Sequence, residues 1–374
     1  MTALAACAAL AAWLYLLVGR GGFWRMREAP PARGPAQRAN VVAVVPARNE
    51  ADVVERAVES LQAQKAPGEF RIVLVDDGST DGTAERARSA APMELLAVLE
   101  SQALPAGWTG KLWALHQGIQ YAERFQPDFL WLTDADIVHP PGSLAGLVAR
   151  AEDERCDLVS LMATLHCRSF AERALIPAFV FFFFMLYPPA WIRDPRREVA
   201  GAAGGCMLVR RSAMDRIGGV AAIRGEWIDD CALAAAVKEG GGRVWLGLSR
   251  ATRSIRPYRG WGELEAMIAR TAFTQLNHSV LLLAVTAAGL IVVYLAPPLL
   301  TFAARPPAKW AGAAAWLLMS AAYYPTLRFY RAGWIWAPLL PLTAAFYLAS
   351  TLHSAAAHWR GRGGQWKGRA AAGS

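Results

Sequence analysis

The chain has 374 residues, 55% of them hydrophobic, and a formal net charge of +9. This length allows a large core and a second module, and a hydrophobic share above the usual value of about 45–50% argues against an ordinary soluble domain and for a membrane protein. Its arginines cluster beside apolar stretches and in the tail rather than on one face with interleaved aromatic residues, so we expect membrane lipid and no nucleic acid as a partner.

The amino-terminal residues form an apolar stretch. Residues 2–18 are almost entirely apolar, and an arginine-rich stretch with the single acid Glu28 follows them. We expect residues 1–20 to be a transmembrane anchor whose carboxyl end faces the cytoplasm, because basic flanks favour that side. A cleaved signal peptide is the alternative, although the stretch lacks a basic start and is followed by what resembles a stop-transfer flank.

From residue 40 the pattern changes to alternating strand and helix signals, which predicts a parallel sheet with crossover helices. Strand-like apolar runs cover 41–45, 71–75 and 129–132, and helical patterns cover 49–64 and 110–121. The carboxyl ends of parallel strands meet at one edge of a sheet, where open α/β folds bind ligands. We therefore expect residues 40–278 to form an α/β domain with its ligand site at that edge.

The first polar motif follows the first strand and contains Pro46, Arg48 and Glu50. It would place an arginine and a helix N-terminus at the strand end, and both suit a diphosphate. The alternative is structural, with Asn49 capping the helix and Glu50 complementing its dipole.

The second motif is Asp76-Asp77-Gly78-Ser79 at the end of the next strand. We expect Asp76 or Asp77 to accept a hydrogen bond from the base or the ribose of a nucleotide. A plain turn followed by a helix cap is the alternative, and it would explain Gly78 and Asp81. It would not explain a strand that ends in two acids.

The third motif, Asp134-Ala135-Asp136, directly follows a strand. Alternate side chains of an extended segment point the same way, so both acids can reach one ligand. Carboxylate oxygens suit Mg²⁺ or Mn²⁺, which neutralise phosphate charge. We assign Asp136 as the metal ligand, and we expect Asp134 to contact the ribose or to support Asp136.

The fourth motif, Trp227-Ile228-Asp229-Asp230, opens a predicted helix after a glycine-rich stretch. We assign Asp230 as the general base that takes a proton from an acceptor hydroxyl. Helix capping is the alternative for one of the two aspartates, and it leaves the other unexplained. Lys111 and Arg270 are further candidates for diphosphate contacts, with a solvated surface side chain as the alternative for each.

Two more apolar regions interrupt or follow this domain. Residues 174–192 include a run of phenylalanines together with prolines, which favours a segment at the bilayer interface or, alternatively, an internal core helix. Residues 280–359 hold three apolar stretches, 280–304, 310–327 and 334–357. Three spans would place the tail, residues 360–374, outside the cell, although its basic residues favour the cytoplasm.

These motifs resemble, over roughly residues 41–278, the family 2 inverting glycosyltransferases of GT-A fold, and the flanking spans resemble the membrane-bound subgroup that contains ceramide glucosyltransferases. The match is closer to the bacterial hopene-associated glycosyltransferases, on the motifs at 107–111, 133–136, 226–230 and 270–275. The resemblance implies a Rossmann-like mixed sheet with crossover helices, a nucleotide-sugar donor, a divalent metal on Asp136 and a base at Asp230.

We therefore expect a multi-pass enzyme of the bacterial inner membrane with its catalytic domain in the cytoplasm. It would transfer one sugar from a nucleotide diphosphate, with a UDP-sugar as the first choice, to a lipid such as a hopanoid. A processive polysaccharide synthase and a non-catalytic membrane scaffold are the alternatives. Membrane members of the family usually carry Gln-x-x-Arg-Trp or Arg-x-x-Arg-Trp after the base, and only Arg270 of that motif is present here, which weighs against the processive synthase.

Overall fold

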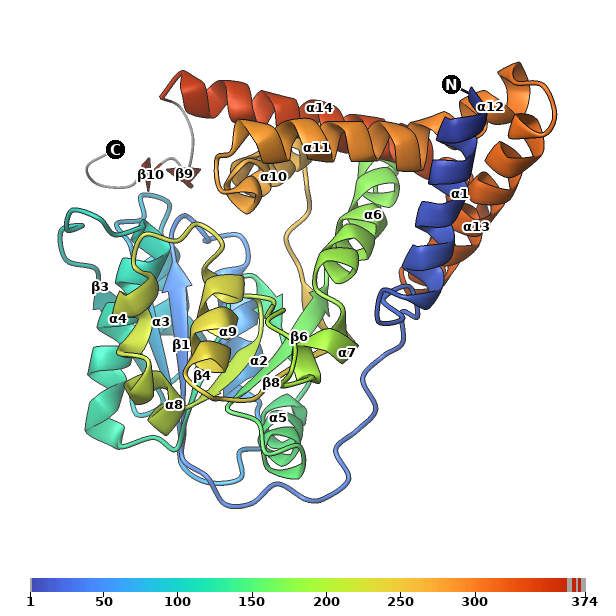
Figure 1. The fold of residues 1–374 in the computed structure, drawn as a ribbon. Coiled ribbons are helices and arrows are strands. Elements are labelled where there is room, and N and C mark those ends of the chain that lie inside the picture. Colours follow the sequence, from blue (N-terminus) through green and yellow to red (C-terminus); the bar gives the residue numbers. More distant parts are fainter. Residues whose placement is uncertain (1, 362–364, 368, 371–374) are drawn as a thin grey trace. The chain divides into compact units, whose positions relative to one another are not determined.

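The computed structural model describes residues 2–361, 365–367 and 369–370. The chain divides into two compact units, which are described separately below. The sheet unit comprises Glu28–Leu165, Trp191–Arg256 and Gln365–Ser374, and the helical unit comprises Met1–Arg27, His166–Ala190 and Pro257–Gly364. Figure 1 shows the ribbon, coloured along the sequence.

An eight-stranded sheet forms the centre of the sheet unit. Its strands, in spatial order, are β3 (Leu96–Glu100), β2 (Phe70–Asp76), β1 (Val41–Ala47), β4 (Phe129–Leu132), β7 (Met207–Arg210), β6 (Leu158–Thr164), β8 (Val244–Ser254) and β5 (Ile137–Val138). Strands β3, β2, β1 and β4 run parallel, whereas β7 is antiparallel to both of its neighbours. The sheet is therefore mixed, and the predicted α/β fold with a mixed sheet is confirmed.

The helices of the sheet unit connect these strands. They are α2 (Val54–Gln62), α3 (Thr83–Ala90), α4 (Gly110–Ala122), α5 (Ser143–Asp153), α8 (Arg211–Arg216) and α9 (Asp229–Glu239), with short 3-10 turns at Glu123–Phe125 and Gly219–Ile223. Another short helix, α7 (Pro189–Arg193), lies where the chain passes between the two units.

Strand β1 lies inside the sheet and all seven of its residues are buried. This explains its continuous, valine-rich sequence, because a strand covered on both faces has no polar side to present. Helix α4 packs closely against it at Gly118, where an added Cβ would lie 2.5 Å from Val44 Cγ1 and 3.0 Å from Val75 Cγ2. A residue without a side chain is therefore required for α4 to lie this near the sheet.

The predicted helix over 49–64 is shorter in the structure, and the predicted cap is wrong. Helix α2 begins at Val54, and Asn49 has a positive φ of 50°. The Asn49 side chain instead accepts a hydrogen bond at 3.0 Å from the backbone N–H of Thr80, in the loop after β2. A tertiary contact between two loops has replaced the local cap, so no helix N-terminus lies directly at the end of β1.

The helical unit contains α1 (Thr2–Val18), α6 (Phe170–Leu186), α10 (Trp261–Ala272), α11 (Val280–Leu290), α12 (Ala296–Ala303), α13 (Ala308–Phe329) and α14 (Leu340–Trp359). A π-helical turn, Ile291–Leu295, joins α11 to α12, and 3-10 turns occupy Thr274–Leu276 and Trp334–Trp336. Side chains from distant helices connect them: Trp13 Nε1 donates to the Val293 carbonyl at 2.8 Å, and the Tyr347 hydroxyl donates to the Leu175 carbonyl at 3.1 Å.

Among the described residues, two helical stretches are long and apolar enough to cross a membrane, Phe170–Arg193 and Val280–Ala303. The second matches the predicted span at 280–304. Helices α13 and α14, at the other two predicted spans, are not among the helices that are both long and apolar enough to cross a membrane. Helix α1 is apolar but has only 17 residues. A membrane location with many spans is therefore not supported by length and composition.

The phenylalanine-rich segment forms one continuous helix, α6, with Pro177 inside it. The helix begins with a capping box, in which Ser169 accepts from the Glu172 backbone N–H and the Glu172 side chain accepts from the Ser169 backbone N–H. The helical stretch Phe170–Arg193 has 56% of its apolar window buried, against 17% for Val280–Ala303. This burial agrees with the core-helix interpretation of the segment.

Candidate active site

The acidic motifs lie at one edge of the sheet unit. Strands β1, β2 and β4 are parallel neighbours, and their register places Ala47 opposite Asp76 and Val44 opposite Leu132. The residues that follow each strand therefore emerge at the same end of the sheet, which is the end where open α/β folds bind ligands.

Arg48 and Asp77 form the first part of this edge. The side chain of Asp77 is fully buried, and Arg48 Nη1 lies 3.6 Å from Asp77 Oδ2. The same guanidinium donates a hydrogen bond to the Asp77 carbonyl oxygen and lies within 3.4 Å of the Gly78 carbonyl oxygen. Arg48 thus connects the end of β1 to the turn after β2.

Asp76 and Asp81 order that turn. Asp76 Oδ1 accepts hydrogen bonds from the hydroxyl of Ser79 and, at 3.3 Å, from its backbone N–H. Asp81 accepts from the Ala51 backbone N–H at 3.0 Å and from the Thr83 hydroxyl. Burial acts to raise the pKa of Asp81, but these hydrogen bonds lower it overall. The predicted alternative of a structural turn therefore accounts for Asp81 and for one oxygen of Asp76.

Lys111 lies between two acids. It is the second residue of α4, whose N-cap Thr109 accepts from the Leu112 backbone N–H. Its ammonium is 3.0 Å from Asp134 Oδ1 and 3.0 Å from Asp229 Oδ2. Burial acts to lower the pKa of Lys111, but the neighbouring carboxylates raise it well above its ordinary value, so the side chain stays charged.

Asp230 accepts two backbone hydrogen bonds in the first turn of α9. Its Oδ2 accepts from the Gly204 N–H at 2.9 Å and its Oδ1 from the Cys231 N–H at 2.8 Å. The N-cap residue of α9 is Ile228, so the alternative that Asp229 or Asp230 caps the helix is wrong. Burial and then the charge of Asp229 raise the pKa of Asp230 to about 6, against the opposing effect of Lys111.

The backbone approaches both groups at Gly204. A Cβ there would lie 3.2 Å from Lys111 Nζ and 3.5 Å from Asp230 Oδ2. These short distances explain why a glycine occupies position 204, in the glycine-rich stretch before β7, and they show that the stretch lies beside Lys111 and Asp230.

Asp136 belongs to a second group of charges, which we call the Asp136 network: Glu50, Asp136, Arg256 and Lys367. Asp136 Oδ2 accepts from the Ser254 hydroxyl at 2.6 Å and is 3.6 Å from Arg256 Nε. Glu50, which is 8% exposed, forms ion pairs with both Arg256 and Lys367. Burial and then the charge of Asp134 raise the pKa of Asp136, and the Ser254 hydrogen bond opposes them.

The donor set of this edge fits a magnesium-type cation. Among the described residues there is no group of three side chains that would hold a metal by themselves. Mg²⁺ commonly binds through one or two protein carboxylates and completes its shell with substrate phosphates and water. Besides burial, the negative charge of Asp134 raises the pKa of Asp136, because the two carboxylates repel each other. A bound divalent cation would offset this repulsion.

Pro46 and Arg270 are the remaining predicted site residues. Pro46 is a buried residue of β1 and lies opposite Val75 of β2, so it is part of the interior of the sheet. Arg270 lies in α10, in the last turn, and belongs to the helical unit. The structure brings Lys111, Asp134 and Asp230 together in one cluster and joins Glu50 to Asp136 through Arg256.

The sequence analysis missed several residues of this edge: Asp229 as the partner of Lys111, and Ser254, Arg256 and Lys367. Ser254 and Arg256 are at the end of β8, which the sequence analysis did not identify as a strand. The apolar run of β8 ends at Leu248, so the polar residues that directly follow it are Ser249 and Arg250, and no local pattern marked Ser254 or Arg256. No signal near Lys367 pointed to Glu50.

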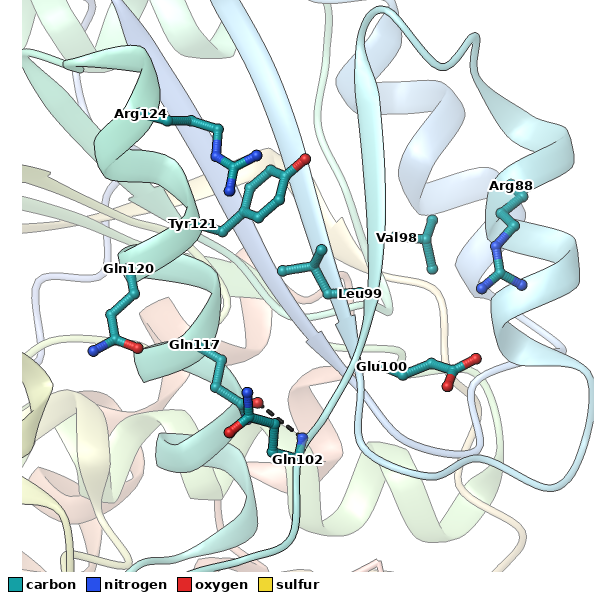
Figure 2. Close-up of a pocket in the computed structure, with 9 residues that line it drawn as sticks. All are labelled: Arg88, Val98, Leu99, Glu100, Gln102, Gln117, Gln120, Tyr121 and Arg124. Atoms are coloured by element: carbon teal, nitrogen blue, oxygen red, sulfur yellow. Dashed lines mark hydrogen bonds between the residues drawn. The ribbon is translucent and has the colours of Figure 1, made fainter.

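A separate polar pocket of about 600 Å³ lies beside edge strand β3, between α3 and α4. Figure 2 shows Arg124 beside Tyr121 in this pocket, where the guanidinium lies 3.7 Å from the ring centre. The Gln102 backbone N–H donates to Gln117 Oε1 at 2.8 Å, and both residues line the pocket. None of the acids described above lines it.

Comparison with known proteins agrees with this geometry. Residues 42–218 match the family model described as glycosyl transferase family 2. No curated protein sequence matches the chain.

One solved structure has the same fold over nearly the whole chain. Mannosyltransferase PcManGT from Pyrobaculum calidifontis, solved in complex with GDP-Man and Mn²⁺, is 20% identical at a TM-score of 0.58, over 95% of this chain and 99% of its own. Glucosyl-3-phosphoglycerate synthase from Mycobacterium tuberculosis, solved with Mn²⁺, UDP-Glc and phosphoglyceric acid, is 17% identical at a TM-score of 0.42, over 64% of this chain and 79% of its own. The second likeness is too remote to support an argument.

The mixed sheet, the acids at the carboxyl ends of its parallel strands and the family match therefore agree. Residues 42–218 are a glycosyl transferase family 2 domain of GT-A fold, and the chain is a glycosyltransferase.

Proposed function

We propose that this glycosyltransferase transfers one sugar, with inversion, from a nucleotide-diphosphate donor to the hydroxyl of a membrane lipid such as a hopanoid. The observation that supports it most is the position of Asp230: a partly buried carboxyl with a pKa of about 6, beside the Lys111–Asp134 ion pair. A carboxylate of this kind is suited to accept a proton near neutral pH.

In the proposed reaction, the Asp230 carboxylate takes the proton of the acceptor hydroxyl. The acceptor oxygen forms a bond to the anomeric carbon from the face opposite the donor phosphate. The bond from that carbon to the phosphate oxygen breaks, and its electron pair leaves with the nucleoside diphosphate. Attack from the opposite face inverts the anomeric configuration, so this chemistry needs one base and no covalent sugar intermediate.

The other residues would bind and orient the donor. Arg48 would contact the diphosphate, with Glu50 holding the neighbouring cations in place. Asp76 or Asp77 would accept from the base or ribose, and Asp134 from the ribose. Lys111 keeps Asp134 and Asp229 in position through its two ion pairs. Arg270, in the helical unit, stays a proposed diphosphate contact.

Asp136 would hold Mg²⁺ or Mn²⁺, which would supply positive charge to offset that of the departing diphosphate. The structure of PcManGT with GDP-Man and Mn²⁺ supports a nucleotide sugar and a divalent cation as the pair to test here. We expected a UDP-sugar from the resemblance, and the GDP-Man of that neighbour makes a GDP-sugar the second donor to test.

The lipid acceptor is proposed from the apolar helices. Val280–Ala303 is long and apolar enough to span a membrane and has little of its apolar window buried. We propose residues 1–20 as an anchor, 40–278 as a catalytic domain facing the bacterial cytoplasm, 280–359 as a membrane region and 360–374 as a basic tail. The arginine-rich stretch after residue 18 supports this orientation in the inner membrane.

The test is transfer of a labelled sugar by the full chain, purified in detergent, to an extract of bacterial membrane lipids. We expect a lipid product heavier by one sugar unit, formed from a UDP- or GDP-sugar and only with Mg²⁺ or Mn²⁺. Asp230→Asn should abolish it, whereas Asp215→Asn, at a position that is 58% exposed on α8, should not.

Three other outcomes would each contradict the proposal. A polymeric product would indicate a processive synthase. Nucleotide binding without transfer to any lipid would indicate a scaffold. Equal turnover by the Asp230→Asn variant and the wild type would remove Asp230 as the base.

A further inference from the structure

A segment near the carboxyl terminus reaches the proposed donor-binding edge. Residues 365–367 and 369–370 belong to the sheet unit, and β9 (Gln365–Trp366) pairs with β10 (Arg369–Ala370). The turn between these strands carries Lys367, whose ammonium forms an ion pair with Glu50 and lies 3.3 Å from the Asn49 carbonyl oxygen. Arg48 Nε in turn lies 3.4 Å from the Lys367 carbonyl oxygen.

These contacts bring Lys367 into the Asp136 network. The Glu50 carboxylate holds Lys367 through one oxygen and Arg256 through the other, and Arg256 is 3.6 Å from Asp136. Burial and then the charge of Arg256 lower the pKa of Lys367 to about 7, while Asp136 and Asp134 act in the opposite direction. Both acids of the Asp-x-Asp motif are thus near enough to interact with this lysine.

The cations around Lys367, and the N–H donor that its ammonium still has available, favour the binding of a phosphate group. Two cations, Arg256 and Lys367, pair with Glu50 after β1, and a third, Arg48, contacts the Lys367 carbonyl oxygen, so positive charge gathers where the donor diphosphate would lie. An ammonium has three N–H donors, and Glu50 and Asn49 take two of them among the described residues. Lys367 is 22% exposed, so its ammonium is partly accessible to a ligand.

We propose that Lys367 is a donor-binding residue, and that the segment carrying it completes the diphosphate site from the far end of the chain. This inference rests on the proposed function, because it takes the ligand to be a nucleoside diphosphate. Glu50 and Asn49 position the ammonium, and the diphosphate oxygens accept its remaining hydrogen bond.

The test measures binding of UDP and of GDP, each with Mg²⁺, to the full chain in detergent by titration calorimetry. In Lys367→Met the dissociation constant should rise about tenfold or more, because a charge-assisted hydrogen bond to phosphate is lost. Lys367→Arg should recover most of the affinity, and Lys65→Met, which removes an exposed lysine of the same unit, should leave it unchanged.

Two further readouts separate binding from a purely structural role. In steady-state transfer, Lys367→Met should raise KM for the donor and leave kcat within about twofold, as expected for loss of uniform binding. With the wild-type chain, the bound diphosphate should slow tryptic cleavage after Lys367, as followed by mass spectrometry. Thermal melting of each variant confirms that it is folded.

The possible negative results distinguish failure of this inference from failure of the proposed function. If the wild type binds a nucleoside diphosphate and Lys367→Met binds it equally well, the inference is wrong while the proposed function stands. Tighter binding by Lys367→Met would mean that the segment obstructs the site, which also overturns the inference. If the wild type binds neither UDP nor GDP, the proposed function itself fails.

Discussion

Asp230 is one of several ionisable side chains at this edge whose behaviour depends on burial. The backbone N–H groups of Gly204 and Cys231 hold its carboxylate in one orientation, while burial and Asp229 make its ionised form less favourable. For Lys111 the charged form is favoured instead: burial acts to lower its pKa, but three neighbouring carboxylates raise it and keep the side chain charged. Residue type alone would assign both groups ordinary titration behaviour.

The pKa of Asp230 predicts the pH profile of transfer. Only the ionised carboxylate accepts a proton, so kcat/KM should rise with pH through about 6 and level off above that value. The measurement is kcat/KM between pH 4.5 and 8.5, with Asp215→Asn, an exposed aspartate of α8, as the control that should keep this limb. An acidic limb near pH 4 would show that Asp230 is not the base.

Lys111→Met tests the ion pairs between α4 and the two acids. The change leaves Asp134 and Asp229 without their shared cation, and we expect a loss of about 2–4 kcal/mol in the free energy of unfolding, less than for a fully buried pair because Asp134 is 34% exposed. The pKa of Asp230 should also rise, because Lys111 acts to lower it. Urea denaturation and the shift of the acidic limb to higher pH are the measurements.

Lys65→Met serves as the matched variant, since Lys65 is an exposed lysine of the same unit. In Lys65→Met, the free energy of unfolding and the pH profile of kcat/KM should both stay as in the wild type. An unchanged pH limb in Lys111→Met would contradict the coupling of Lys111 to Asp230.

At the scale of elements, the parallel strands and the helix packed on them align the site. Helix α4 carries Lys111 in its first turn and Gly118 two turns later, so its distance from β1 also sets the distance of Lys111 from the strand ends. The site and the core are therefore coupled through a single helix.

Gly118→Ala tests this coupling. The new Cβ would lie 2.5 Å from Val44 Cγ1, on a β-branched side chain that has few other rotamers, so α4 must move outward. We expect a loss of about 1–3 kcal/mol in stability, typical of overpacking, together with reduced kcat. Gly146→Ala on α5 is the control, because nothing lies within 4 Å of a Cβ there.

Chemical denaturation and steady-state kinetics measure both effects. If Gly118→Ala were as stable and as active as Gly146→Ala, the close packing of α4 on β1 would be refuted.

At the scale of the whole molecule, the sheet unit holds the acids and the helical unit holds the apolar helices. The stretch Val280–Ala303 has side chains that are widely exposed, among them Val285 at 59%. Exposed apolar residues in such number are typical of a surface that contacts lipid.

Ile291→Arg, at a position that is 48% exposed in the middle of Val280–Ala303, tests whether this stretch crosses the membrane. An arginine near the centre of a transmembrane helix costs about 2.5–3.5 kcal/mol in insertion, so we expect less protein in carbonate-washed membranes. Met93→Arg, at a position that is 89% exposed in the sheet unit, should not change the membrane fraction. Equal membrane fractions for the two variants would argue against a span at Val280–Ala303.

The local parts of the site could be predicted from the sequence. The strands that end at Asp76 and before Asp134 are short apolar runs followed by acids, and both the apolar run and the turn residues act over a few neighbours along the chain. The same holds for α4, which the pattern predicted to begin at Gly110 and which does so. Element type and the edge of the acids therefore followed from the sequence alone.

Contacts between distant segments were decided only by the tertiary structure. Asn49 does not cap a helix, because its side chain accepts a hydrogen bond from Thr80 in the loop after β2. Arg256 lies near Asp136 because β8 belongs to the same sheet and ends at Ser254. Lys367 reached Glu50 across more than 300 residues of sequence. Such pairings depend on strand order and on the burial of charged groups, and neither is encoded in a local window of residues.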